Sequence, residues 1–389
     1  MKYVSRALGG EMVEAAKYFS AILLTGPRRS GKTTLLTHLF PKATYVLLED
    51  ADIVARVRSD PRSFLETLSL PAILDEIQNV PELLTYIRTR IDNQPSRKGQ
   101  WLLTGSQEAP LMRGVAESMA GRAAVFSLLP FSREEARAVS LLRGGFPEVL
   151  ASPGAAGTWF RSYVQTYLER DVRAVTSIRD LSTFRRFMGL LATRCGQMLN
   201  KTDLAAPLGV SVPTIGQWLS ILEITGQIIL VPPFYENFGK RLVKTPKLYF
   251  VDSGLVASLL GIHDQSTLEE SPFYGPLFEG LVASEIVKHR LNRGLDRALY
   301  YFRDKQGLEV DFIVDLGNRK LALLEAKATR TPMPDDARAI VRLRAAIPRA
   351  EVEAGVVHVD SAAGSKVAPL SRGARGIPFS ALHDFLNRS

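Results

Sequence analysis

The fold of the first part of this 389-residue chain is decided by Gly26-Pro27-Arg28-Arg29-Ser30-Gly31-Lys32-Thr33-Thr34. This stretch matches G-x-x-x-x-G-K-[ST], and it lies between an apolar run at residues 21–25 and a helical pattern at residues 32–39. Such a loop points its backbone N–H groups at phosphate, and the helix start adds a positive dipole end. We therefore predict that residues 26–34 bind nucleotide phosphates, with Lys32 at the β- and γ-phosphates and Thr33 on Mg²⁺.

A second apolar run ends in two carboxylates. Residues 72–76 read Ala-Ile-Leu-Asp-Glu, so a buried strand would deliver Asp75 and Glu76 to its carboxyl end, beside the phosphate loop. Asp75 can hold Mg²⁺ directly or through water, and Glu76 can polarise the attacking water. This pair favours hydrolysis, because a small-molecule kinase needs no second carboxylate there. The alternative is an exposed acidic pair at a strand end.

Three further residues are candidates for the same site. Thr104 or Ser106, at the end of another apolar run, can lie between the catalytic water and the γ-phosphate. Arg122 can reach a γ-phosphate on its own or a neighbouring subunit, as arginine fingers do. An ordinary surface arginine is the alternative for Arg122.

Apolar runs alternate with helical patterns through the first 130 residues. Strands are predicted at residues 21–25, 45–48, 71–74, 101–104 and 125–128, with a helix at residues 81–92. This alternation predicts an α/β fold with a parallel sheet and helices on both faces. Residues 132–135 (Ser-Arg-Glu-Glu) fit a capping box that opens a helix, and the pattern stays helical to about residue 195.

The composition narrows the class of protein. The chain is 46% hydrophobic and 23% charged, which is ordinary for a globular protein. Its net charge of +9 favours the binding of polyanions such as nucleic acid; the alternative is that the basic residues only form a solvated surface. A single cysteine, Cys195, excludes an internal disulfide and a zinc site made of several cysteines. No apolar leader and no apolar run of about 18 residues is present, so we expect a cytoplasmic protein without a membrane partner.

Residues 201–231 have the pattern of a helix-turn-helix with a following strand. A helix begins near residue 201, Leu-Gly-Val makes the turn at 208–210, and Ser211 caps a second helix. Its outward positions are Thr214, Gln217 and Ser220, and residues 228–231 can form a wing strand. Because these outward positions carry no cation, Arg241, Lys244 and Lys247 would have to supply phosphate contacts. The alternative is a domain that packs on its own protein and contacts no DNA.

A second constellation of carboxylates lies near the end of the chain. Strands are predicted at residues 298–302, 309–314 and 321–326, after a Gly-, Ser- and Pro-rich loop (261–276) and a helix near 277–292. Glu325 and Lys327 share a strand face, and a hairpin can bring Asp311 beside them. Glu279 and Glu285 on the helix are added, with Glu285 facing inward. Such carboxylates can hold Mg²⁺, and a lysine can activate water.

The first set of motifs resembles the AAA-type ATPases, and within them a prokaryotic archaeal-type and initiator-like group. Gly121-Arg122, the Leu-Pro-Phe-Ser segment at 129–132 and Gly-Gly-Phe-Pro-Glu at 144–148 also match that group and its helical lid. The second set resembles the PD-(D/E)xK nuclease superfamily, with Val310 at the usual proline, and the resembling ATPases carry such a domain. A nuclease fold used only for binding is the alternative. The resemblance also favours ATP over GTP.

The expected architecture follows from these parts. Residues 1–130 would form the P-loop ATPase core, 131–180 a helical lid, 181–260 a winged helix, and 270–389 an α/β restriction-endonuclease-like domain. We expect ATP and Mg²⁺ as cofactors, DNA as a partner, and leave a homo-oligomer open. The function expected is ATP hydrolysis that moves the attached domains. The alternatives are a slowly hydrolysing switch that binds DNA or protein, and an ATP-gated nuclease.

Overall fold

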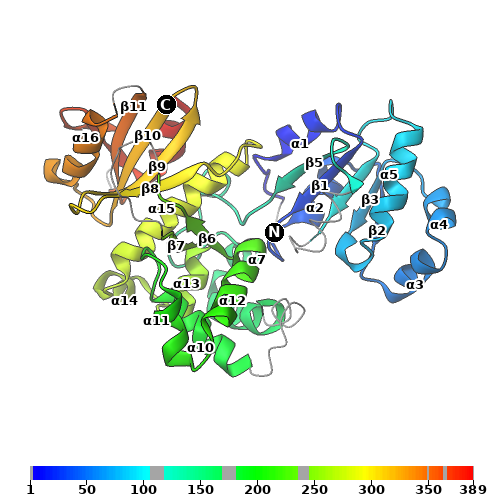
Figure 1. The fold of residues 1–389 in the computed structure, drawn as a ribbon, viewed down its shortest axis with the longest axis horizontal. Coiled ribbons are helices and arrows are strands. Elements are labelled where there is room, and N and C mark those ends of the chain that lie inside the picture. Colours follow the sequence, from blue (N-terminus) through cyan, green and yellow to red (C-terminus); the bar gives the residue numbers. More distant parts are fainter. Residues whose placement is uncertain are drawn as a thin grey trace.

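The computed structural model describes residues 3–105, 118–168, 181–234, 245–347, 350–361 and 366–388. These form an N-terminal α/β part, a mainly helical middle part and a C-terminal α/β part (Figure 1). The middle part contacts both of the others, through Tyr163 to Arg28 and through Lys247 to Glu279.

The N-terminal part is built on a five-stranded parallel sheet in the order β2-β3-β4-β1-β5. Its strands are β1 (Ala21–Thr25), β2 (Thr44–Leu47), β3 (Ala72–Asp75), β4 (Trp101–Thr104) and β5 (Ala123–Ser127). Its described helices are α1 (Gly9–Ala15), α2 (Lys32–Leu39), α3 (Ala51–Ser59), α4 (Pro61–Thr67) and α5 (Leu83–Asn93). The predicted α/β fold with a parallel sheet is confirmed, and strand ends fall within two residues of the prediction.

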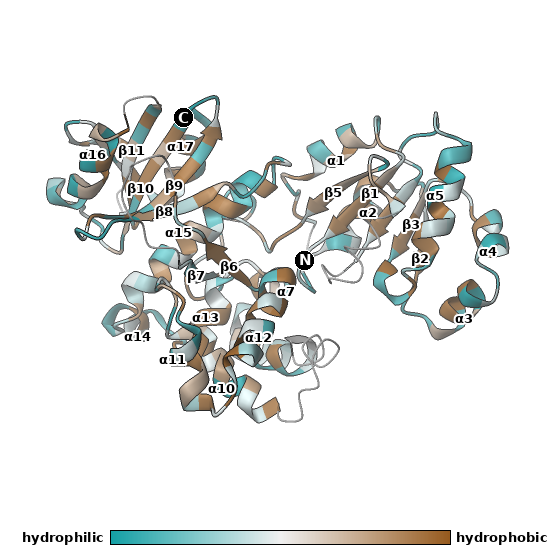
Figure 2. Cartoon of the chain, in the orientation of Figure 1, coloured by the Kyte–Doolittle hydropathy of each residue, from teal (hydrophilic) through white to brown (hydrophobic). Residues whose placement is uncertain are grey.

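Alternate residues of β1 explain why helices cover both faces of this sheet. Ile22 and Leu24 pack with residues of α1 and α2, whereas Leu23 packs with residues of α3, α4 and α5. A central parallel strand that is buried on both faces must be apolar at every position. The strands of this sheet are accordingly hydrophobic along most of their length (Figure 2).

The middle part combines short helices with a two-stranded antiparallel hairpin. Its helices are α7 (Pro147–Ala151), α8 (Ala156–Tyr163), α10 (Leu181–Ala192), α11 (Lys201–Ala205), α12 (Val212–Ile224) and α13 (Ser253–Leu259). The hairpin consists of β6 (Ile228–Val231) and β7 (Lys247–Phe250). The predicted cap of α12 is confirmed, because the Ser211 side chain accepts a hydrogen bond from Thr214 N and a proline occupies the first turn.

Two local predictions in this region are wrong. The capping-box hydrogen bonds between Ser132 and Glu135 do form, but they close a turn and no helix follows. The carboxylate of Glu135 also binds Arg6 and Ala7 N, which ties the turn to the N-terminal segment. The expected loop at 261–276 contains α14 (Gln265–Glu270) and the start of α15 (Tyr274–Leu291). Asp264 caps α14, so the short polar run forms a helix.

The C-terminal part is a six-stranded mixed sheet in the order β12-β13-β11-β10-β9-β8. Its strands are β8 (Leu299–Arg303), β9 (Glu309–Gly317), β10 (Lys320–Lys327), β11 (Glu351–His358), β12 (Ala368–Ser371) and β13 (Ala374–Pro378). Helices α15, α16 (Arg338–Ala345) and α17 (Leu382–Arg388) pack on it. The three predicted strands are confirmed as β8, β9 and β10, and the predicted helix as α15.

Short helical segments complete the described chain. They are η1 (Ile77–Asn79), η2 (Pro153–Ala155), η3 (Val164–Leu168, a π-helix), η4 (Ala206–Leu208), η5 (Pro334–Ala337) and η6 (Phe379–Ala381).

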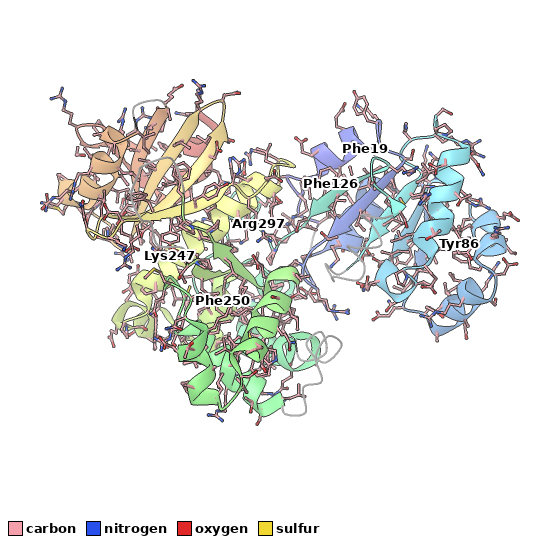
Figure 3. The ribbon with its side chains drawn as sticks, viewed as in Figure 1. Phe19, Tyr86, Phe126, Lys247, Phe250 and Arg297 are labelled. Atoms are coloured by element: carbon pink, nitrogen blue, oxygen red, sulfur yellow. The ribbon has the colours of Figure 1, made fainter. Side chains whose placement is uncertain are left out.

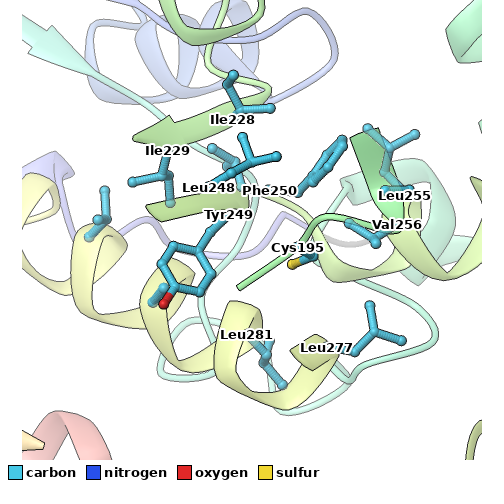
Figure 4. Close-up of a cluster of buried hydrophobic side chains, with 14 of the residues drawn as sticks. Cys195, Ile228, Ile229, Leu248, Tyr249, Phe250, Leu255, Val256, Leu277 and Leu281 are labelled. Atoms are coloured by element: carbon cyan, nitrogen blue, oxygen red, sulfur yellow. The ribbon is translucent and has the colours of Figure 1, made fainter. Parts of the chain in front are cut away.

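One continuous apolar core joins the middle and C-terminal parts. It includes side chains of the hairpin β6–β7, of α13 and of α15, among them Leu248, Leu255 and Leu281 (Figure 4). Tyr249 points from β7 toward α15 in the same view. Because the hairpin and α15 share this close-packed core, a displacement of the hairpin would shift the side chains of α15 in the C-terminal part.

Candidate functional site

The glycine-rich loop leaves the carboxyl end of β1 and enters α2. Gly26 has a φ of 138°, and a Cβ there would lie 2.2 Å from Leu128 O, so only glycine fits. Gly31, at the N-cap of α2, has a φ of 94°. These two residues let the loop turn back over the start of the helix, as the sequence predicts.

Lys32 lies at the mouth of this loop. Its side chain is buried, and Nζ donates hydrogen bonds to Gly26 O (3.1 Å) and Pro27 O (3.0 Å). The neighbouring cavity of about 390 Å³ is lined by Lys32 and Thr33 and also by Glu76. The residues expected to bind phosphate and metal and to position water therefore face one space.

Asp75 is the centre of a hydroxyl cluster at the end of β3. Thr33 Oγ1 donates to both carboxylate oxygens of Asp75 (3.1 and 2.9 Å), and Tyr45 Oη donates to Oδ2 (2.8 Å). Thr104 Oγ1 also donates to Asp75, and it accepts a hydrogen bond from Glu76 N (3.0 Å). Burial, followed by the hydrogen bond to Asp75, raises the pKa of Tyr45. Sequence reasoning missed Tyr45, because it lies on another strand with no motif around it.

Glu76 follows β3 in a left-handed conformation with a φ of 61°. Its side chain is half-buried and accepts a hydrogen bond from Gln78 Nε2. Of the two residues left open at the end of β4, Thr104 joins the Asp75 cluster, whereas Ser106 lies outside the described residues.

The remaining loop residues divide between two adjoining cavities. Arg28 and Arg29 line the same cavity as Lys32, and Arg29 lies 3.5 Å from the Glu148 carboxylate. A second cavity of about 390 Å³ shares Ser30 and Thr34 with the loop. Its apolar lining comes from Tyr3, Val4, Leu35, Phe131, Pro147 and Ala151.

Arg6 secures the loop from outside, and no sequence motif marked it. Its guanidinium donates to Ser30 O (2.9 Å), to Leu129 O (2.6 Å) and to the Glu135 carboxylate (2.9 Å). The side chain is buried and lies over the Phe131 ring, 4.5 Å from its centroid. Arg6 therefore links the phosphate loop to the segment that leaves the sheet.

Arg122 and the phosphate loop lie at opposite ends of the parallel strands. Arg122 immediately precedes β5 and so lies at the amino ends of the strands, whereas the loop leaves the carboxyl end of β1. The guanidinium pairs with the Asp92 carboxylate (2.6 and 3.0 Å). The structure thus contradicts a contact between Arg122 and a phosphate on its own loop, and the contact with a neighbouring subunit stays a prediction.

Four predicted residues of the C-terminal part converge at one place. Asp311 on β9 accepts a hydrogen bond from Ala326 N (3.0 Å), which sets it beside Glu325 on the paired strand β10. Lys327 Nζ donates to Glu325 Oε1 (3.1 Å). Glu279 on α15 joins them through Lys247, whose Nζ is 3.2 Å from Glu279 Oε1 and 3.4 Å from Asp311 Oδ1.

The environment of these carboxylates is unusual. Burial, reinforced by the Asp311 charge, raises the pKa of Glu325 to about 8 and that of Glu279 to about 7. Glu325 Oε2 is buried and has no hydrogen-bond partner among the described residues. A divalent cation would satisfy this oxygen and lower both pKa values, so the donor set fits Mg²⁺.

Lys247 corrects an expectation about DNA. It is 3% exposed, and its ammonium lies 2.7 Å from Glu309 Oε1 as well as beside Glu279 and Asp311. Burial alone would lower the pKa of Lys247, but these carboxylates raise it above its usual value. In Figure 3 the residue lies on β7 beside the C-terminal part. A buried lysine held this way is not available to a DNA phosphate.

The other residues predicted to contact DNA are only partly described. Gln217 and Ser220 are exposed on α12 and Thr214 is half-buried, whereas Arg241 and Lys244 lie outside the described residues.

Glu285 faces inward as predicted, but it does not join the carboxylates of the C-terminal sheet. It is fully buried and accepts hydrogen bonds from His383 Nε2 (2.8 Å), Arg133 N (2.7 Å) and Lys288 Nζ (3.2 Å). Burial would raise the pKa of Glu285, but these partners together hold it below the usual value. The assignment of Glu285 to the nuclease-like site is therefore wrong, because its charge is already neutralised elsewhere.

Comparisons with known proteins agree with the geometry of the first sheet. A family model described as an AAA domain matches residues 18–137, so this part is a P-loop AAA domain. Models for two domains of unknown function, DUF8612 and DUF4143, match residues 135–266 and 274–379. The uncharacterized proteins Rv2008c of Mycobacterium tuberculosis and Mb2031c of Mycobacterium bovis are 33% identical over 319 residues, which is 80% of this chain and 71% of theirs. The chain belongs to the same family as these two proteins.

Solved structures give a weaker likeness. The Walker-type ATPase PABY2304 of Pyrococcus abyssi is 18% identical with a TM-score of 0.41, over 65% of this chain and 94% of that one. The T158V variant of Thermotoga maritima RuvB is 18% identical with a TM-score of 0.31, over 58% and 87%.

Among the described residues, no single helix has the length and apolar character to cross a membrane. The bent pair Lys201–Leu208 and Val212–Ile224 passes that test only when its two helices are combined.

Proposed function

We propose that this chain is a Mg²⁺-dependent ATPase whose nucleotide state controls a nuclease-like domain through the hairpin β6–β7. The observation that carries the proposal is the meeting of Thr33, at the start of α2, with Asp75, at the end of β3 (2.9 Å between Oγ1 and Oδ2). The hydroxyl and carboxylate oxygens of this pair are hard donors of the kind that Mg²⁺ prefers, and Thr33 lines the same cavity as Lys32.

Each residue of this site has a role in hydrolysis. The loop amides and Lys32 would bind the β- and γ-phosphates, and Thr33 and Asp75 would hold Mg²⁺, which neutralises phosphate charge. Glu76 would orient and polarise the attacking water. Thr104 would hold both acidic residues in place, because its hydroxyl donates to the Asp75 carboxylate and accepts a hydrogen bond from Glu76 N. Ser30 Oγ is buried without a partner among the described residues, which fits a phosphate ligand.

The second cavity suits a nucleotide base. It adjoins the phosphate loop through Ser30 and Thr34, and its walls are mainly apolar and aromatic side chains. A flat base would be buried between the N-terminal segment and α7. Because Pro147 and Ala151 of α7 line this cavity, a bound base would contact the middle part directly.

Two contacts support a route from the loop to the hairpin. Tyr163 Oη lies 3.4 Å from Arg28 O and accepts a hydrogen bond from Gln227 Nε2 (2.9 Å). Next to it, a Cβ on Gly226 would lie only 3.1 Å from Pro27 Cδ. A loop that changes shape around a γ-phosphate would therefore displace residues 226–227, which lead directly into β6.

The hairpin ends at the carboxylates of the C-terminal part. Strand β6 pairs with β7, which presents Lys247 to Glu279 and Asp311 and donates the Tyr249 hydroxyl to Glu279. Withdrawal of Lys247 would leave these carboxylates free for a divalent cation. We propose a PD-(D/E)xK-type centre in which Glu279, Asp311 and Glu325 bind the cation and Lys327 activates water.

The helices α10, α11 and α12 with the hairpin β6–β7 follow the order of a winged helix. The exposed residues Gln217 and Ser220, together with the net charge of +9, support DNA as the partner. The second candidate is a nucleotide-gated switch with an inactive nuclease-like domain. The observation in its favour is Lys247, because its ammonium occupies the position where a catalytic cation would be needed.

The ATPase proposal is tested by steady-state hydrolysis of Mg²⁺–ATP, with and without DNA, by the wild type, Lys32→Ala and Glu76→Gln. We expect turnover in the wild type only, with stimulation by DNA and with nucleotide binding retained in Glu76→Gln. Tight nucleotide binding without hydrolysis in the wild type would favour the switch. Equal turnover in all three proteins would sink the assignment of this site.

The nuclease-like centre needs a separate assay. Cleavage of single- and double-stranded DNA in Mg²⁺ or Mn²⁺ with ATP is compared for the wild type, Asp311→Ala and Lys327→Ala. Activity lost in both variants supports a nuclease. Absence of cleavage in every combination supports the inactive domain of the switch.

A further inference from the structure

Three side chains with metal-binding atoms meet where the AAA domain joins the C-terminal part. Glu134 comes from the turn that follows the first sheet, His289 from the last turn of α15, and His383 from α17. Both histidines are buried, whereas the Glu134 side chain is 36% exposed. The cluster is separate from the phosphate loop and from the carboxylates around Lys247.

The spacing of the donor atoms suits a tetrahedral cation. His383 Nδ1 lies 3.2 Å from His289 Nδ1 and 3.1 Å from Glu134 Oε2, and all three donor atoms lie within 4.8 Å of one another. Zinc bound by nitrogen or oxygen at about 2.0–2.1 Å has tetrahedral edges of about 3.3 Å. The third pair of donor atoms, on His289 and Glu134, lies within 4.8 Å, and the part-exposed Glu134 side chain has room to adjust.

The second carboxylate, Glu285, prepares His383 for this role. It accepts the His383 Nε2 proton at 2.8 Å and is itself held by Arg133 N and Lys288. A carboxylate on the far nitrogen fixes the tautomer, orients the ring and directs the other nitrogen at the metal. The inward position of Glu285 is then explained as support for a neighbouring ligand.

The neighbouring charges leave one oxygen of the Glu134 carboxylate available to a cation. Arg293 donates to Glu134 Oε1 (3.3 Å), so Glu134 Oε2 is the oxygen that faces the histidines. Arg290 and Lys288 are the other cations nearby, and Lys288 is paired with Glu285.

A proton can also hold the cluster together. A doubly protonated His383 would bridge two carboxylates, with Nε2 at 2.8 Å from Glu285 Oε2 and Nδ1 at 3.1 Å from Glu134 Oε2. In that form the Nδ1 proton would be shared between Glu134 Oε2 (3.1 Å) and His289 Nδ1 (3.2 Å), so only metal uptake distinguishes the proton from a cation. A cation shared by both nitrogens and Glu134 Oε2 uses all three donor atoms.

We propose that Glu134, His289 and His383 form a binding site for a Zn²⁺-class divalent cation that ties the end of the AAA domain to α15 and α17. Two imidazoles and one carboxylate select Zn²⁺, Co²⁺ or Ni²⁺ over Mg²⁺. The cation fixes the junction across which the two enzyme-like parts of the chain are connected.

Co²⁺ binding by the full chain, freed of metal with EDTA, tests the proposal. Excess Mg²⁺ in the buffer occupies the oxygen-rich sites, and nucleotide is left out. We expect one equivalent of Co²⁺ with the intense visible bands of tetrahedral nitrogen coordination, displaced by one equivalent of Zn²⁺. Zn²⁺ should also raise the melting temperature, because it binds only the folded junction.

Variants of the proposed ligands distinguish Co²⁺ binding at this site from binding elsewhere on the chain. Glu134→Gln changes a part-exposed side chain and should fold normally, yet it should weaken Co²⁺ binding by about tenfold or more, as should His289→Gln. His358→Gln is the matched control, because His358 is a buried histidine on β11 away from the cluster. Wild-type protein that takes up no Co²⁺, or Glu134→Gln and His289→Gln that bind it as the wild type does, would overturn the proposal and leave a proton-linked network.

Discussion

Lys247 Nζ lies 3.2 Å from Glu279 Oε1 and 3.4 Å from Asp311 Oδ1, although Lys247 belongs to the hairpin of the middle part. Two carboxylates of a proposed catalytic centre are therefore neutralised by a cation from another part of the chain. This relationship makes the hairpin and the C-terminal centre depend on each other.

Lys247→Met tests this dependence. The change leaves buried carboxylates without their cation, and removing one partner of such a group costs about 3–5 kcal/mol of unfolding free energy. We expect that loss in denaturant titrations with EDTA and a partial recovery with Mn²⁺, which can replace the ammonium. Lys320→Met, which breaks an exposed pair with Glu351, is the control and should cost under about 1 kcal/mol. Equal stability of the two variants would contradict the buried cluster.

Glu76→Gln should separate binding from hydrolysis. The amide keeps the shape of the side chain but cannot take a proton from water, so the hydrolysis rate should fall by about 10²–10⁴. Nucleotide affinity, measured by calorimetry, should change little because Lys32 and the loop are intact. Glu82→Gln alters an exposed carboxylate on the same stretch of chain and should leave the rate unchanged. A rate loss below about threefold in Glu76→Gln would remove Glu76 from the reaction.

Gly226→Ala should disturb the phosphate loop from a distance. Gly226 and Gly209 have φ values of 70° and 66°, so alanine costs about 1 kcal/mol of backbone strain at either position. Only at Gly226 would the new Cβ meet Pro27, at 3.1 Å, whereas space is open at Gly209. We expect weaker binding of Mg²⁺–ATP in Gly226→Ala and normal binding in Gly209→Ala. Identical affinities would argue against the route from the loop to the hairpin.

The Cys195 thiol should be inert in the folded protein. Burial, followed by the charge of Glu279, raises its pKa to about 12. The folded pKa exceeds the unfolded value. The contribution of this thiol to the free energy of unfolding is therefore fully present below about pH 8.5 and is lost as the pH rises toward 12. A thiol-specific disulfide reagent at pH 8 should react at least about 100-fold faster after unfolding in guanidinium. Rapid reaction of the native protein would show that the core around β7 opens readily.

The sequence was sufficient for the parts of the fold that depend on contiguous residues. The phosphate loop, β3 with Asp75, and the cap of α12 follow from local spacing, and the structure has each of them where predicted. Capping at Ser132 shows the limit, because its hydrogen bonds form but the Glu135 carboxylate also serves Arg6 from the N-terminal segment. Local pattern cannot reveal such a shared partner.

Long-range partners were beyond prediction for the same reason. The periodicity of α15 correctly predicted that Glu285 faces inward. Only the fold shows that its partner is His383, almost one hundred residues later in the chain, which donates a hydrogen bond to the Glu285 carboxylate. Lys247 looked like a surface cation near a DNA-reading helix, and its pairing with Asp311 requires the hairpin and the C-terminal sheet to be assembled. Arg6 and Tyr45 carry no motif, and they reach the site only through the order of the strands.

The three hydroxyl groups on Asp75 come from Thr33, Tyr45 and Thr104, which lie on separate elements. An ion that takes this carboxylate as a ligand must break at least one of these bonds. Tyr45 stands on the edge strand and is 45% exposed, so its phenol is the partner most easily released. The chain therefore carries an intrinsic optical probe, whose ultraviolet absorption should register metal loading without any added label.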